Sequence, residues 1–171
     1  MNLNKFTLKT QEELQNGQRF AESSSHQQLE PEHLLWVLLA DSDGIVPAIF
    51  ARLGGTPGSL QEQIRKSLEK FPVVQGMEGS YMSQRFRQVL DLAFTEASNM
   101  KDEFISTEHV LLALSEDREL KPWFLRQGIT HEKIYAALAE VRGSQRVTDQ
   151  NPEEKYQALE KYTRRSEEHT S

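Results

Sequence analysis

The chain of 171 residues contains no cysteine. Disulfide frameworks, thiolate metal sites and cysteine nucleophiles are therefore excluded. No apolar run reaches the roughly 20 residues that a membrane-spanning helix needs, and the first residues lack the basic, apolar and small-residue order of a secretory signal. We expect a cytoplasmic protein with no membrane partner.

Basic residues are fewer than acidic residues. The chain has 20 Lys and Arg against 26 Asp and Glu, so its formal net charge is −6 at pH 7. Proteins that bind nucleic acid usually show a net basic face, and we therefore expect no nucleic-acid partner. Apolar residues make up 37% of the chain, which is enough for a folded core.

Motifs of catalysis are missing as well. The sequence has no G-x-S-x-G, no H-E-x-x-H, and no Walker A spacing, because the glycines of Gly54–Gly58 lack the following Lys and Ser/Thr. We therefore expect no catalytic residues, no metal site and no cofactor in this chain, and no enzyme activity.

What the sequence does contain is an internal repeat. The stretch EPEHLLWVLL at Glu30 returns 76 residues later as STEHVLLALS at Ser106. After a loss of two residues the displacement becomes 74, and Phe50 then matches Phe124 while Gly54 matches Gly128. Matching helix ends and apolar positions indicate that one structural unit is built twice.

Helical periodicity dominates both copies. Pro31 favours a helix start over a central strand, and Ser106 is a suitable N-cap. We predict an all-α fold of eight helices, arranged as two four-helix repeats about a pseudo-twofold axis. The first repeat covers residues 1–74 and the second 75–143, together forming one domain. Residues 144–163 are expected to be a linker, and 164–171 a non-native tail, since they match a translated sequencing adapter.

The doubled Glu-His pair has two interpretations. A reacting pair or metal site needs further ligands three or four residues away on the same helix face, and none is there. In the structural interpretation, Glu32 and Glu108 interact with the helix dipole, worth roughly 0.3–1 kcal/mol. His33 and His109 then begin the buried stripe and bond a neighbouring backbone group. We favour the structural interpretation.

Large aromatic residues exceed what a small bundle needs in its core. We expect most of them inside and some along an apolar groove between the repeats, rimmed by acids and suited to extended or unfolded peptides. The candidates are Trp36, Phe50, Phe86, Phe94, Trp123 and Phe124.

Four stretches together resemble the Clp N-terminal domain of ClpB-type AAA+ disaggregases. They are FTLKTQEEL, EPEHLLWVLL, DEFISTEHVLLAL and the linker RVTDQNPE, and the resemblance runs from residue 1 to about 163. It implies a mobile domain at the entrance of a hexameric ring that captures unfolded or aggregated polypeptide for ATP-driven threading. ATP and magnesium belong to the ATPase module of the parent, before which this chain is expected to be truncated. An Hsp70-type chaperone would act through other domains, and the fragment itself is expected to be a monomer.

The resemblance also implies substrate-binding residues, namely Thr7, Asp102 and Glu108. Each has a structural alternative: Thr7 as a helix cap, Asp102 as a solvated loop acid, and Glu108 as a partner of the helix dipole. Leu14 and Leu90 are apolar groove candidates, and core positions suit them equally. A histidine at position 109, where some family members carry an apolar residue, is expected to make the groove more polar.

Two other functions compete with this one. The first is the adaptor-docking N domain of a ClpA- or ClpC-type protease unfoldase, against which the RVTDQNPE linker speaks. The second is an enzyme on a helical scaffold, which the lack of an acid–base or metal constellation disfavours.

Overall fold

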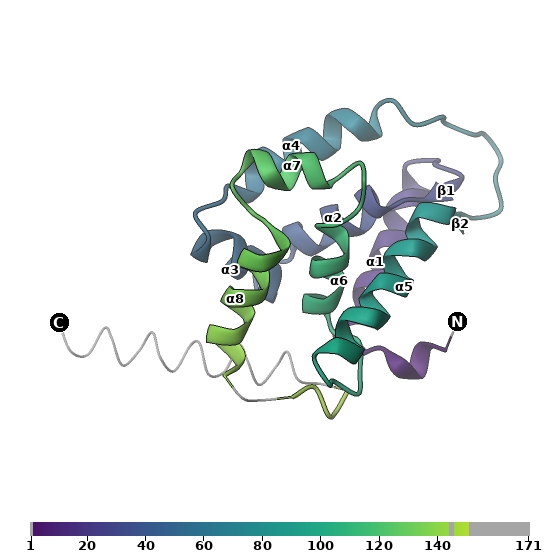
Figure 1. The fold of residues 1–171 in the computed structure, drawn as a ribbon. Coiled ribbons are helices and arrows are strands. Elements are labelled where there is room, and N and C mark those ends of the chain that lie inside the picture. The colour runs from purple at the N-terminus through teal and green to yellow at the C-terminus, as the bar shows by residue number, and fades with distance from the viewer. Residues whose placement is uncertain (1, 144–145, 151–171) are drawn as a thin grey trace.

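A computed structural model describes residues 2–143 and 146–150 (Figure 1). Within these residues it confirms the all-α fold, with eight α-helices, one 3-10 turn and two short strands. Their bounds in chain order are η1 Leu3–Lys5, α1 Leu8–Ser23, β1 Gln28–Leu29, α2 Pro31–Ala40, α3 Ile45–Arg52, α4 Pro57–Leu68, β2 Tyr81–Met82, α5 Gln84–Asn99, α6 Thr107–Leu114, α7 Lys121–Arg126 and α8 His131–Arg142. The predicted tail and most of the predicted linker lie outside the described residues. The predicted boundary after residue 74 falls in the connection between α4 and β2, and it stays a prediction.

Backbone pairing shows the pseudo-twofold symmetry. Met82 of β2 pairs with Leu29 of β1 in parallel, and Phe6 forms a parallel bridge with Ile105. A displacement of 76 converts positions 6 and 29 into 82 and 105, so one pairing is the symmetry mate of the other. The segment ahead of the first helix of each repeat thus pairs with the segment ahead of the second helix of the other, which locks the two repeats into one domain.

The second helix of each repeat lies at the centre of the molecule. In Figure 1, α2 and α6 occupy the middle, α1 and α5 flank them on one side, and α3 and α8 lie on the other. All eight residues of α6 are buried. The rings of Phe50 and Phe124, which match under the repeat, pack against each other with centroids 5.7 Å apart. The core therefore runs continuously from one repeat into the other.

Hydroxyl side chains cap the first helix of each repeat. The Thr7 hydroxyl accepts the Thr10 amide at 3.2 Å, and the Ser83 hydroxyl accepts the Phe86 amide at 3.0 Å. These bonds satisfy amide groups that the first turn of a helix leaves without an intrahelical partner. Gly54 follows α3 with a φ of +76°, a left-handed conformation that glycine adopts at little cost.

The short strands and the exposure of Phe94, one of the groove candidates, add two details to the predicted fold. The two-residue strands were not predicted, because so short a pairing leaves no alternating pattern. On α5 the buried stripe runs through Phe86, Ala93 and Ala97, whereas Phe94 is 52% exposed. At about 100° per residue Phe94 lies about 80° away from Phe86, and the small alanines form the contact face instead. No single helix among the described residues is long and apolar enough to cross a bilayer.

Candidate functional site

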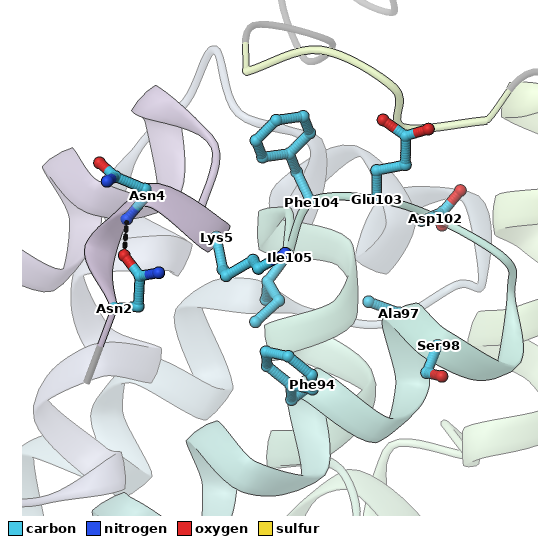
Figure 2. A pocket seen from close by; sticks show the side chains of 10 residues that line it. All are labelled: Asn2, Asn4, Lys5, Phe94, Ala97, Ser98, Asp102, Glu103, Phe104 and Ile105. Carbon is cyan, nitrogen blue, oxygen red and sulfur yellow. Dashed lines mark hydrogen bonds between the residues drawn. The ribbon is translucent and has the colours of Figure 1, made fainter.

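A cavity of about 600 Å³ opens where three segments meet. Its walls are η1 with its flanking residues, the C-terminal half of α5, and the segment 102–105 that leads into α6 (Figure 2). We call this cavity the groove. It is lined by Asn2, Asn4, Lys5, Phe94, Ala97, Ser98, Asp102, Glu103, Phe104 and Ile105.

The groove combines aromatic and charged groups. Phe94 projects from α5 and is half exposed, and Phe104 contributes a second, partly buried ring from the opposite wall (Figure 2). Lys5 and Glu103 add one charge of each sign, both on exposed residues. An apolar floor with a polar rim can hold an extended peptide without any covalent chemistry.

Beneath the groove lies a buried charge cluster. Arg142 Nη2 donates to Asp102 Oδ1 at 2.6 Å, and Arg142 Nη1 lies 3.0 Å from Glu108 Oε1. His109 donates through Nε2 to Asp102 Oδ2 at 2.7 Å, while its Nδ1 accepts the Ser106 amide at 2.8 Å. Every one of these side chains is almost completely withdrawn from solvent. The cluster joins α8, α6 and the wall of the groove.

The charges in this cluster are fixed by their partners. Burial tends to raise the pKa of Asp102, but hydrogen bonds from His109, Arg142 and the Val147 amide outweigh it and lower that pKa to about 2. Burial lowers the pKa of His109, although Asp102 opposes this. Asp102 is thus an anion and His109 a neutral imidazole at pH 7.

Three ligand atoms in the cluster lie within 4.8 Å of one another, one each from Asp102, Glu108 and His109. Such spacing could suit a cation. Arg142, however, already lies against both carboxylates and supplies the positive charge. We therefore interpret the cluster as an ion-paired support for the groove and not as a metal centre.

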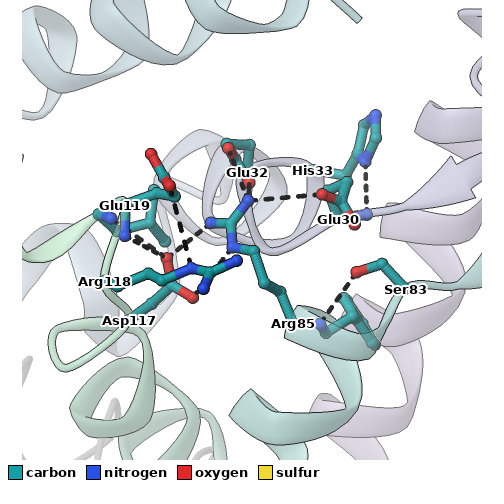
Figure 3. Close-up of polar contacts among 10 residues, drawn as sticks. Glu30, Glu32, His33, Ser83, Arg85, Asp117, Arg118 and Glu119 are labelled. Atoms are coloured by element: carbon teal, nitrogen blue, oxygen red, sulfur yellow. Dashed lines mark hydrogen bonds and ion pairs between the residues drawn. The ribbon is translucent and has the colours of Figure 1, made fainter. Parts of the chain in front are cut away.

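The first repeat carries a related arrangement around Glu32. Arg85 of α5 contacts Glu32 Oε1 at 3.2 Å and Asp117 Oδ2 at 2.6 Å (Figure 3). His33 accepts the Glu30 amide through Nδ1 at 2.9 Å, as His109 does with Ser106. The predicted backbone bonds of both histidines are confirmed, since each histidine forms part of a capping box. Each glutamate also meets an arginine, which the sequence did not indicate.

The predicted substrate-binding residues are brought together only in part, and all are buried. Asp102 and Glu108 share Arg142, and Asp102 also lines the groove. Thr7 is fully buried and caps α1. Leu14 and Leu90 belong to the hydrophobic core. Contact between these five residues and a substrate stays a prediction, and substitutions at Asp102 and Glu108 are expected to lower stability as well.

One expectation about the groove was wrong. His109 is 0% exposed and points inward to Asp102, so it does not change the polarity of the groove surface. The sequence analysis missed Lys5, Glu103 and Phe104. An aromatic residue inside the charged loop KDEF was the available signal for Phe104, whereas nothing in the sequence places Lys5 beside it.

Comparison with known proteins gives the fold and the family. The model of the Clp repeat (R) N-terminal domain matches residues 5–128. Chaperone protein ClpB of Bacillus anthracis is 39% identical over 169 residues, which is 96% of this chain and 20% of that protein. Chaperone protein ClpB of Bdellovibrio bacteriovorus is 40% identical over 161 residues, which is 92% of this chain and 19% of that protein. The chain thus spans about a fifth of the length of these curated relatives.

Solved structures of Clp-type N-terminal domains have the same fold. The Hsp104 N-terminal domain from Candida albicans has a TM-score of 0.77 at 25% identity, with 87% of this chain and 99% of that chain covered. The N-terminal domain of the ClpV1 ATPase from E. coli shares the fold, with a TM-score of 0.72 at 19% identity. The match covers 88% of this chain and 92% of that chain. From the matched domain and the identity to ClpB proteins, the chain belongs to the Clp repeat N-terminal domain family.

Proposed function

We propose that this chain is the substrate-binding N-terminal domain of a ClpB-type disaggregase and that the groove binds unfolded or aggregated polypeptide. The observation that carries the proposal is a large cavity with two aromatic rings, one of them half exposed, in a wall supported by buried charges. Phe94 and Phe104 together give the groove apolar surface that an extended apolar segment can cover. The groove holds polypeptide without chemical change.

The relatives support this function over adaptor docking. The two relatives described above, at 39% and 40% identity, are both named as ClpB chaperones. In such a parent, a hexameric ring would thread the captured polypeptide with ATP and magnesium, and an Hsp70-type chaperone would cooperate through other domains. These partners and cofactors belong to the proposal, as does a cytoplasmic location.

Binding in the groove is expected to be weak and reversible. Two aromatic rings and a few polar groups form a contact well below the roughly 1,200 Å² of a stable protein–protein interface. A ring that threads its substrate needs this weakness, because it must release what the N-terminal domain captured.

Substitution of Phe94 tests the proposal. Phe94→Ala is expected to weaken binding of a reduced, unfolded model protein such as casein about three- to tenfold, because one aromatic anchor is worth on the order of 1 kcal/mol. Stability should change little, since the ring is half exposed. Binding is measured by fluorescence anisotropy and stability by urea unfolding.

Leu125→Ala on α7 is the matched control, because Leu125 is 49% exposed and does not line the groove. If Phe94→Ala and Leu125→Ala bind the unfolded protein as the unsubstituted chain does, the groove is not the binding site. If the unsubstituted chain itself does not bind, the proposed function is wrong.

A further inference from the structure

Residues 146–150, which we call the strap, run along the rim of the groove. Figure 2 shows them as the yellow-green tube above Phe104, Glu103 and Asp102. The Val147 amide donates to Asp102 Oδ1 at 2.8 Å, and the Val147 carbonyl accepts the Glu103 amide at 2.8 Å. Farther along, the Gln150 carbonyl accepts the Leu8 amide at 2.7 Å, and Gln150 Nε2 donates to the Asn4 carbonyl at 3.2 Å.

Most of these bonds use the main chain of the strap. Leu8 is the first residue of α1, so its amide has no partner within the helix. The Glu103 amide and Asp102 Oδ1 are likewise groups on the groove wall that any extended backbone could satisfy. Recognition through the main chain tolerates many sequences, which is how extended peptides bind next to exposed strands and loops.

Val147 supplies a buried apolar side chain of the strap. Val147 is 0% exposed, whereas its neighbours Arg146 and Thr148 are exposed. The corresponding residue of the first repeat, Val73, also follows the last helix of its repeat, forms a bridge with His26, and is 62% exposed. Val147 is therefore buried where its counterpart in the first repeat is exposed, and its main chain bonds Asp102 and Glu103 of the groove wall.

We propose that the strap is a displaceable occupant of the substrate site. An extended stretch of incoming polypeptide replaces it, taking over the Leu8 and Glu103 amides and placing a medium-sized apolar residue with a free N–H where Val147 lies. Displacement uncovers Asp102 Oδ1 and widens the groove. This inference rests on the proposed function and specifies its substrate as extended, apolar segments without proline at the anchoring position.

A covalent lock on the strap provides the test. Because the chain has no cysteine, Asn4→Cys and Gln150→Cys can be joined selectively in the full chain with a short bifunctional maleimide. We expect the locked protein to bind unfolded casein at least tenfold more weakly than the same double variant without the linker. The two single variants, each capped with a monofunctional maleimide, control for the added groups.

Val147→Pro tests the opposite direction. It removes the N–H that Asp102 accepts, and it should raise casein affinity about three- to tenfold by freeing the site. Thr148→Ala is the control and should bind as the unsubstituted chain does. Circular dichroism and urea unfolding establish whether each variant is folded. If Val147→Pro does not fold, the cross-linked double variant still tests the inference.

Amide hydrogen exchange separates displacement from simple addition of substrate. With casein bound, the Val147 amide should lose protection while the Leu8 and Glu103 amides keep theirs. If the unlocked chain binds casein and the locked chain binds equally well, or Val147 stays protected, the strap inference is wrong and the proposed function stands. If the unlocked chain does not bind at all, the proposed function fails first.

Discussion

His33 and His109 hold equivalent positions in the two repeats but face different acceptors. Nδ1 of each accepts a backbone amide, so each neutral ring carries its proton on Nε2. His33 directs this proton to Nδ1 of His26 at 2.9 Å, whereas His109 directs it to the anion Asp102. A carboxylate stays an acceptor in mild acid and an imidazole does not. In mild acid the His33–His26 hydrogen bond can therefore lose its acceptor, whereas the His109–Asp102 hydrogen bond keeps its own.

His33 makes one contribution to the pH dependence of stability. Burial, and then the nearby His26, lower its pKa to about 4 from an ordinary value of 6.5. Between these values the unfolded chain binds the proton and the folded chain does not, so the free energy of unfolding falls as pH falls from 6.5 to 4. The loss is at most on the order of 3 kcal/mol. His33→Gln should remove most of this dependence in urea unfolding at pH 7 and 4.5, and an unchanged dependence would contradict the assignment.

Glu13 gives a prediction of opposite sign. Burial raises its pKa to about 7, although Lys9 opposes this. The folded chain then binds a proton between pH 4.5 and 7 that the unfolded chain does not, so stability is lost as pH rises through 7. Glu13→Gln should therefore gain more stability at pH 8 than at pH 5, by on the order of 2 kcal/mol. Glu12→Gln, on an exposed neighbour, should show no such difference in urea unfolding.

At the scale of the elements, two arginines hold neighbouring segments together: Arg85 joins the second repeat to the first, and Arg142 joins segments within the second repeat. Arg85 links the start of α5 to the start of α2 and to the turn after α6, and Arg142 links the end of α8 to the loop before α6. Each arginine satisfies two acids that are nearly or wholly buried. Removing an arginine leaves carboxylates in a low-dielectric interior, which costs far more than the loss of a surface ion pair.

Arg85→Met is expected to lower the free energy of unfolding by about 3–5 kcal/mol, because Glu32 and Asp117 lose their partner. Arg87→Met is the matched control on the same helix, since Arg87 is exposed, and it should cost less than about 0.5 kcal/mol. Equal stability of the two variants in urea unfolding would show that Arg85 does not hold the repeats together.

At the scale of the whole molecule, sequence patterns predict the fold but not the groove. Helix starts and the repeat are local patterns, so the eight helices and the pseudo-twofold arrangement were predicted. The groove was not, because Lys5 and Phe104 meet through a pairing of segments about a hundred residues apart. Helical periodicity assigns charged residues to the surface, and it therefore could not reveal that Glu108 and Arg142 are buried together.

The most direct test of binding in the groove is to map the residues of the domain that unfolded polypeptide contacts. Amide chemical shifts are followed by NMR while unfolded casein is added to the isotope-labelled chain. We expect the largest chemical-shift changes at Lys5, Phe94 and Phe104 around the groove. Changes confined to another cavity, of about 340 Å³ beside Phe71 and Tyr81, would contradict this expectation.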